Sequence, residues 1–173
     1  MSNYTPTEFI EMMNLQHGAP RKFDRAIALD TETSGLHPDD GARVSTVSIA
    51  FAIHPTEQDL VLYWTERIPG RVAGDGYVVE AAWEDICDGE RRLIVSAAWP
   101  FDQGVEATGK PEDDGSQSLF PETANQPQAE WEALTLFLSR PYIRLVFHHA
   151  KFDIAMMRAG CRRWPGLGVD LLP

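Results

Sequence analysis

Apolar residues recur at intervals of three and four in three stretches of the chain, which is the spacing of one helix face. They predict helices over residues 6–16, 127–139 and 150–159, the last ending at Gly160. The first has the clearest start, because Thr5-Pro6-Thr7-Glu8 has the capping-box order of residues with proline at the first helical position. The predicted buried faces contain Phe9, Ile10, Met13, Trp131, Leu134, Phe137, Leu138, Phe152, Ala155, Met156 and Ala159.

Short apolar or β-branched runs predict the strands. They cover residues 25–30, 44–53, 59–65, 91–98 and 143–147, and the runs at 25–30 and 143–147 are typical of buried strands. Glycine recurs in 70–76, and glycine and proline recur in 100–126, so we predict loops there; the longer is expected to be an insertion that is functional or mobile. Strands followed by helix, strand and helix predict a mixed α/β fold around a central sheet, in a single domain spanning residues 1–173.

Composition narrows the choice of function. No apolar run approaches the roughly 20 residues of a membrane helix, and the first seven residues lack the pattern of a signal peptide. Cys87 and Cys161 have neither metal-site spacing nor the density of a disulfide framework, so we expect a reducing cytoplasm. A net charge of −11 argues against binding nucleic acid through a broad basic surface, but not against an enzyme that holds phosphate through divalent cations.

Two carboxylates stand close together at the end of the first predicted strand. Asp30 and Glu32 are two residues apart, so in a strand their side chains project from the same face, just before the Ser34-Gly35 turn. Two ionised carboxylates at that spacing repel each other unless a cation compensates them, and oxygen ligands suit Mg²⁺ or Mn²⁺. Taken by itself, so short a pattern is more often a solvated turn.

The surrounding residues resemble two motifs of one enzyme family. Residues 27–36 (IALDTETSGL) resemble the first motif of the DEDD 3′–5′ exonucleases, the DnaQ-like enzymes with an RNase H-like fold. Residues 145–153 (LVFHHAKFD) resemble their second motif, an apolar strand followed by a His-Asn-Ala-Lys-Phe-Asp sequence that opens a helix. The similarity spans about residues 25–160, and is closest to the proofreading domains of family A DNA polymerases and to phage-type exonucleases.

The resemblance implies a site and a reaction. Asp30, Glu32 and Asp153 would bind two Mg²⁺ or Mn²⁺ ions and hydrolyse 3′-terminal phosphodiester bonds of single-stranded or frayed DNA, with RNA the lesser possibility. The fold would be an RNase H-like mixed sheet flanked by helices. A DNA polymerase domain or subunit is a further expected partner, and no membrane is expected. The residues implied in binding the terminal nucleotide are Thr31, Thr33, Leu36, His148 and Phe152.

The chain departs from the family pattern in three ways. His149 stands where the family usually has Asn, and Phe147 where Gly is common. The adjacent His148 and His149 could instead suggest zinc, although neighbouring residues seldom converge on one ion. The third motif, with the fourth acid, is missing, and Asp170 is too near Asp153 to supply it. We therefore expect the C-terminal part of the fold to be missing, and the alternative function is a non-catalytic remnant that binds DNA ends or a polymerase partner.

The main basic cluster of the sequence lies beside the second motif. Its members could contact DNA phosphates or could simply form a solvated helix face, and the sequence favours neither. They are Lys151, Arg158, Arg162 and Arg163.

Overall fold

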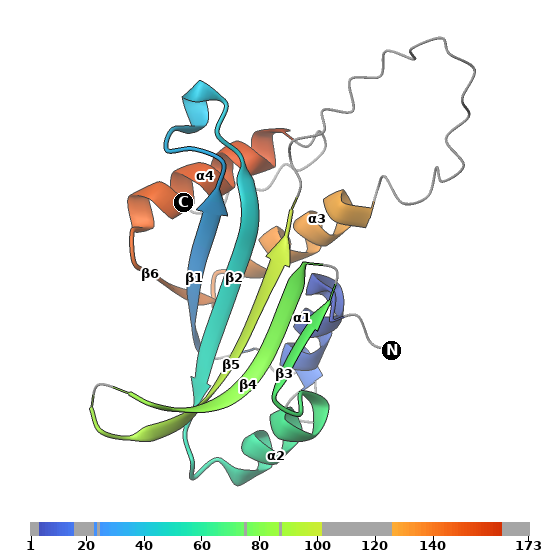
Figure 1. Cartoon of the computed structure of the whole chain (residues 1–173), viewed down its shortest axis with the longest axis vertical. Coiled ribbons are helices and arrows are strands. Elements are labelled where there is room, and N and C mark those ends of the chain that lie inside the picture. The colour runs from blue at the N-terminus through green and yellow to red at the C-terminus, as the bar shows by residue number, and fades with distance from the viewer. Residues whose placement is uncertain are drawn as a thin grey trace, which may run out of the picture.

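A six-stranded mixed sheet forms the centre of the protein in the computed structural model, which describes residues 4–15, 23, 25–74, 76–86, 88–101 and 126–163. The order across the sheet is β3-β4-β5-β2-β1-β6 (Figure 1). The strands are β1 (Ala26–Thr33), β2 (Val44–Ile53), β3 (Arg71–Gly74), β4 (Tyr77–Asp85), β5 (Arg91–Pro100) and β6 (Arg144–Phe147). The helices are α1 (Pro6–Leu15), α2 (Gln58–Arg67), α3 (Gln126–Leu138), α4 (Ala150–Arg163) and a 3-10 turn, η1 (Pro38–Asp40).

Strand β1 joins an antiparallel part of the sheet to a parallel edge. It is antiparallel to β2, which is antiparallel to β5, and it is parallel to β6. The chain therefore passes from β5 through α3 into β6, and β6 runs in the same direction as β5. The predicted loop over 100–126 lies in this connection. Its first and last residues belong to β5 and α3, and residues 102–125 lie outside the described part of the chain.

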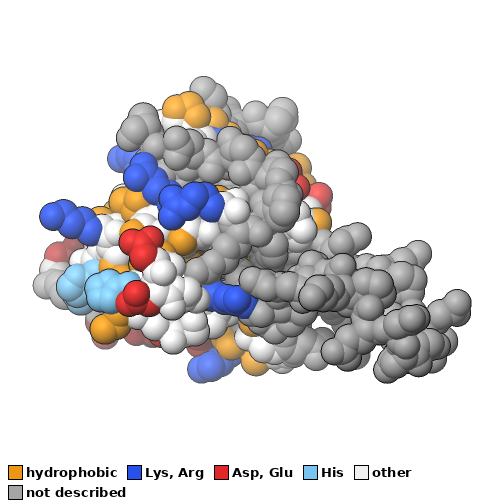
Figure 2. Space-filling view, turned by 90° about the horizontal axis from the view of Figure 1, so that it is seen from above, with side chains coloured by type: hydrophobic (Ala, Val, Ile, Leu, Met, Phe, Trp, Pro, Cys, Tyr) orange, Lys and Arg blue, Asp and Glu red, His pale blue; other side chains and the backbone are white. Residues whose placement is uncertain are grey.

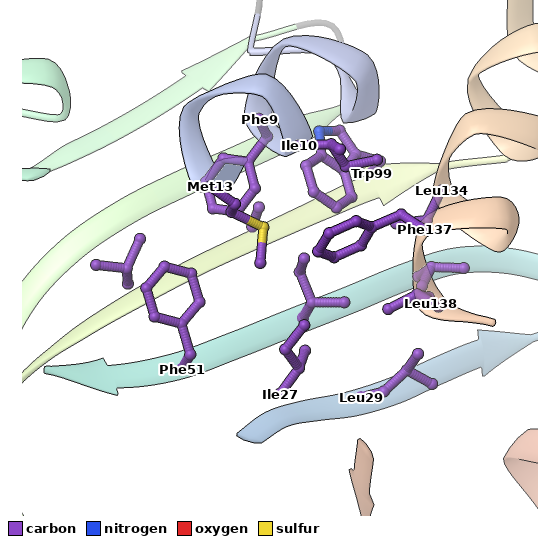
Figure 3. Close-up of a cluster of buried hydrophobic side chains, with 14 of the residues drawn as sticks. Phe9, Ile10, Met13, Ile27, Leu29, Phe51, Trp99, Leu134, Phe137 and Leu138 are labelled. Atoms are coloured by element: carbon purple, nitrogen blue, oxygen red, sulfur yellow. The ribbon is translucent and has the colours of Figure 1, made fainter. Parts of the chain in front are cut away.

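One face of the sheet carries the hydrophobic core. Helices α1, α3 and α4 lie behind the sheet as it is seen in Figure 1. Phe9 of α1 is fully buried, with its ring centroid 5.5 Å from that of Trp64 and 5.4 Å from that of Trp99. Side chains from α1 and α3 point onto those of β1, β2 and β5 (Figure 3). The capping box forms as predicted, because Thr5 N–H donates to Glu8 Oε2 at 3.0 Å and Glu8 N–H donates to Thr5 Oγ1 at 3.3 Å.

The opposite face of the sheet is open among the described elements. Its central positions are, except for one isoleucine, small residues that stay partly accessible to solvent, although they lie in the middle of the sheet. Residues at these positions would be buried if a helix layer covered them. The central members of this open face, which is the face seen in front in Figure 1, are Ala28, Ser48, Ala50, Ala52, Ile94, Ser96 and Ala98.

Most predicted elements are confirmed within a few residues, with four corrections. Residues 59–65 are part of helix α2 and not a strand: Leu60 and Trp64, one helical turn apart, are its buried residues. The loop predicted over 70–76 contains β3. Strand β6 is not buried, since it is an edge strand with half-buried and exposed residues in alternation. Helix α4 continues past Gly160, which is itself buried. No helix among the described residues is long and apolar enough to span a membrane.

Candidate active site

The acidic pair lies in the second half of β1. Asp30 and Glu32 are exposed on the open face. Leu29, which precedes them, and Thr31, which lies between them, are buried on the helix side. Asp30 is paired with Ser48 of β2, and the register between the two strands shifts just after Glu32. The prediction that the two carboxylates share one face is confirmed.

Asp153, the acid of the second motif, contacts β1 at Thr31, the residue between Asp30 and Glu32. Thr31 N–H donates a hydrogen bond to Asp153 Oδ1 at 3.1 Å, and Thr31 Oγ1 donates to the same oxygen at 2.8 Å. Asp153 is 2% exposed, and its other oxygen, Oδ2, is buried without a hydrogen-bond partner among the described residues. Residues that are 122 positions apart in sequence are thus joined by two hydrogen bonds.

The course of β6 explains why Asp153 reaches this place. The last residue of β6, Phe147, pairs with Leu29, so the edge of β1 beyond Leu29 has no partner from β6. The chain then turns into α4, and Asp153 lies in the first turn of that helix. Its carboxylate accepts from Thr31 N–H, which the parallel strand no longer serves. A buried main-chain donor requires such an acceptor, so the end of β6 and the start of α4 are matched to the edge of β1.

His148 and His149 occupy the turn between β6 and α4. Both are exposed, and their rings stack with centroids 4.5 Å apart and an interplanar angle of 8°. His149 also caps the helix, because its carbonyl accepts from Phe152 N–H at 2.8 Å. Acidic and histidine side chains lie side by side at the end of the molecule where β1 finishes, with lysine and arginine side chains on the same face (Figure 2). No group of three or more His, Cys, Asp or Glu side chains within the described ranges is arranged to hold a metal ion.

The turn after β1 presents Leu36 to solvent. Thr33 Oγ1 donates to the Gly35 carbonyl at 2.7 Å, and Ser34 N–H donates to the Arg43 carbonyl at 2.9 Å. A Cβ on Gly35 would approach the Cβ of Ala42 to 3.2 Å, so a glycine lets the turn pass close to that residue. Leu36 is 75% exposed, the largest exposed fraction among the exposed large apolar side chains of the described residues.

The structure therefore places the predicted site residues in two groups. Thr31 and Asp153 are bonded to each other at the edge of β1, and Asp30 and Glu32 lie on the adjoining open face. Phe152 is half-buried beside Asp153, and Thr33 and His148 flank the same end of the strand. The basic cluster lies along α4, with Lys151 and Arg162 exposed and Arg158 half-exposed; the side chain of Arg163 lies outside the described residues, as does Asp170.

Sequence reasoning missed two cavities. One, of about 470 Å³, is mainly apolar and lies between α4 and the edge strand, lined in part by Leu145, Phe147 and Met157. The other, of about 380 Å³, is polar and gathers Arg25, Glu57, Arg92 and Arg144 at the opposite end of β1. These residues come from four separate segments, so a prediction that they lie together would have required the pairing register of the strands.

Comparison of the chain with protein-family models, with curated proteins and with solved structures finds no match in any of the three.

Proposed function

We propose that the protein is a metal-dependent 3′–5′ exonuclease that releases nucleoside monophosphates from DNA ends. The observation that carries this proposal is the junction between the two motif segments. Thr31, which stands between Asp30 and Glu32, is bonded twice to Asp153 across 122 residues of sequence. A chance similarity in two separate segments would give no reason for them to meet at their acidic residues. The mixed sheet with β1 parallel to β6 supports an RNase H-like arrangement.

The oxygen chemistry of these carboxylates suits divalent cations, although no three described acids are grouped closely enough to hold one. Asp153 Oδ2 is buried without a partner among the described residues, and such an oxygen is costly unless a cation or donor meets it. Asp30 and Glu32 add two exposed carboxylates on one face. Asp30, Glu32 and Asp153 would hold two Mg²⁺ or Mn²⁺ ions. Bound there, the ions would activate water and neutralise charge on the phosphodiester.

The protein's own groups would orient the substrate. Thr31 fixes the Asp153 carboxylate through its main-chain N–H and its hydroxyl. Leu36 offers an exposed apolar surface to the terminal base, and Thr33, His148 and Phe152 border the same end of β1. Single-stranded or frayed 3′ ends are the favoured substrate because they can enter such a surface without unpairing. A polymerase domain or subunit would supply these ends, and we expect both in the cytoplasm.

The test is the degradation of a 5′-labelled single-stranded oligonucleotide with Mg²⁺ or Mn²⁺. The wild-type chain should give a ladder of products shortened from the 3′ end, and a chelator should abolish it. Asp30→Asn and Asp153→Asn should lower the rate by at least about 100-fold, because each removes a ligand charge. Asp59→Asn is the matched control: Asp59 is an exposed acid in the first turn of α2, and this change should leave the rate unaltered.

A thermal-unfolding series separates loss of metal binding from loss of the fold. Mg²⁺ at ten times its dissociation constant should stabilise the wild-type chain by about 1.4 kcal/mol. Asp30→Asn should retain the metal-free stability and lose most of this gain. A folded wild-type chain that binds oligonucleotides but never shortens them would instead favour the non-catalytic remnant, and endonucleolytic or 5′-directed products would contradict the proposal.

A further inference from the structure

The polar cavity at the far end of β1 gathers arginine side chains in an acidic protein. Its lining holds three guanidinium groups, those of Arg25, Arg92 and Arg144, and one carboxylate, that of Glu57. The whole chain carries a net charge of −11 with only 15 Lys and Arg residues. Three of those 15 line one cavity of about 380 Å³, where Arg25 pairs with Glu57 and Arg92 pairs with Asp88 and Glu90, so the cavity offers an anion clustered guanidinium donors and not an excess of net charge.

Neighbouring acceptors hold two of these arginines in place. Arg25 donates to the Ala52 carbonyl at 3.0 Å and forms an ion pair with Glu57. Arg92 donates to Glu90 Oε2 at 2.8 Å and lies 3.4 Å from Asp88 Oδ2. Each guanidinium has five N–H donors, and these contacts use only some of them. The Nε atoms of Arg25 and Arg92 are buried with no acceptor in the described part of the chain.

The cavity and the acidic pair lie on the same face of the same strand. Ala26 lines the cavity, and Ala28, Asp30 and Glu32 follow it at alternate positions of β1, all exposed. Asp30 lies four positions beyond Ala26 along the strand, a span of roughly 13 Å. Ala28 pairs with Ala50, so the surface between the two ends has a floor of small side chains.

We propose that the arginine cavity binds a backbone phosphate of the nucleic-acid strand whose 3′ end lies at Asp30 and Glu32. This rests on the proposed exonuclease function and names a second contact for its substrate. Guanidinium groups match phosphate geometry, with paired N–H donors to two oxygens. Small residues along the floor let the strand cross the open face between the metal ligands and the arginines. The chain thus holds the terminal phosphodiester through carboxylate-bound cations, and an internal phosphate directly.

The contact predicts a dependence on substrate length. Binding of a dinucleotide, an octanucleotide and inorganic phosphate is measured over a range of salt concentrations with Ca²⁺ in place of Mg²⁺, so that the carboxylates can hold a cation while cleavage is suppressed. Arg144→Gln should weaken octanucleotide binding about fivefold at 0.1 M salt and reduce the slope of log K against log salt by about 0.7. The dinucleotide is too short to span the distance and should bind the variant and the wild type equally.

Controls make the result specific to the cavity. Arg71→Gln removes an exposed arginine from the β3 edge of the same sheet and should leave octanucleotide affinity and slope unchanged. Arg92→Gln should reproduce the effect of Arg144→Gln. Three results would each overturn the proposal. Arg144→Gln could weaken dinucleotide and octanucleotide binding equally, or Arg71→Gln could weaken octanucleotide binding as much as Arg144→Gln does. Arg144→Gln could also abolish the binding of inorganic phosphate while octanucleotide binding is kept.

Failure of this proposal differs from failure of the exonuclease itself. If the wild-type chain shortens the octanucleotide while Arg144→Gln and Arg92→Gln leave affinity and salt slope unchanged, the cavity proposal alone is wrong. If the wild-type chain neither binds nor shortens any oligonucleotide, the proposed function is wrong and the cavity proposal fails with it.

Discussion

Thr31→Val tests the bond that joins the two motif segments. Valine keeps the shape of threonine, so the change removes the hydroxyl that donates to Asp153 Oδ1 at 2.8 Å and keeps the main-chain bond at 3.1 Å. Thr31 is 6% exposed and Asp153 is 2% exposed, so water cannot easily replace the lost donor. A hydrogen bond to a charged group contributes about 1.5–3 kcal/mol. For a chain of 173 residues, a loss of about 2 kcal/mol lowers Tm by about 4–8 °C.

Thermal unfolding in chelator measures this loss without any contribution from bound metal. Thr135→Val is the matched control. Thr135 is also fully buried, but its hydroxyl donates to the carbonyls of Trp131 and Glu132 in its own helix, which keep their main-chain partners. It should lower Tm by about 2 °C or less. A double-mutant cycle with Asp153→Asn should show coupling of about 1–2 kcal/mol. If Thr31→Val costs no more than Thr135→Val, or the cycle shows no coupling, the bond does not hold the motifs together.

Two further predictions concern the exposed turn at Leu36 and the ion pair between Arg25 and Glu57. Leu36→Ala should leave the free energy of unfolding within about 0.5 kcal/mol of the wild-type value, because Leu36 is 75% exposed. The same change should raise KM for the oligonucleotide about tenfold with little change in kcat. Leu62→Ala, at an exposed position on α2, is the control for both measurements. The hydrogen bond from Arg25 lowers the pKa of Glu57 below its ordinary value of 4.5, so the Glu57 charge stabilises the fold above pH 4.5 and this contribution is lost as pH falls through the lowered pKa. Urea unfolding should find Glu57→Gln less stable than wild type by about 1 kcal/mol at pH 7, and a gap that persists unchanged at pH 3 would contradict this.

The sequence predicts best those elements whose burial is decided within the element itself. Strand β2 has the predicted bounds, since β-branched and apolar residues alternate with small ones and every second residue from Val47 to Ile53 is buried. Helix α1 begins at the predicted residue because its start depends on a local capping box. Helix α2 was predicted as a strand because Val61, Tyr63 and Thr65 favour strands, whereas the burial of Leu60 and Trp64 one turn apart decides its conformation.

Of the candidate site, the sequence predicts the shared face of the acidic pair but not the contact between the two motif segments. Strand alternation alone places Asp30 and Glu32 on one face. The bond between Thr31 and Asp153 depends on β6 ending opposite Leu29, which is a tertiary property that no local pattern encodes. The apolar run before Asp30 was interpreted as a buried strand; alanines at 26 and 28 keep it apolar in sequence while they lie exposed on the open face.

The alternation of β1 lets one strand contribute to the core and to the candidate site at once. Ile27, Leu29 and Thr31 face the helices, and each is buried, so the strand is fixed by apolar contacts and by the bond to Asp153. Asp30 and Glu32 are thereby held on the other face, so only groups or ions outside the core can offset the repulsion between the two carboxylates. The energy that positions the two carboxylates comes from residues they do not touch. A substitution on the helix side of β1 should therefore disturb the site by moving the strand, and one on the open face should alter binding while the fold is kept.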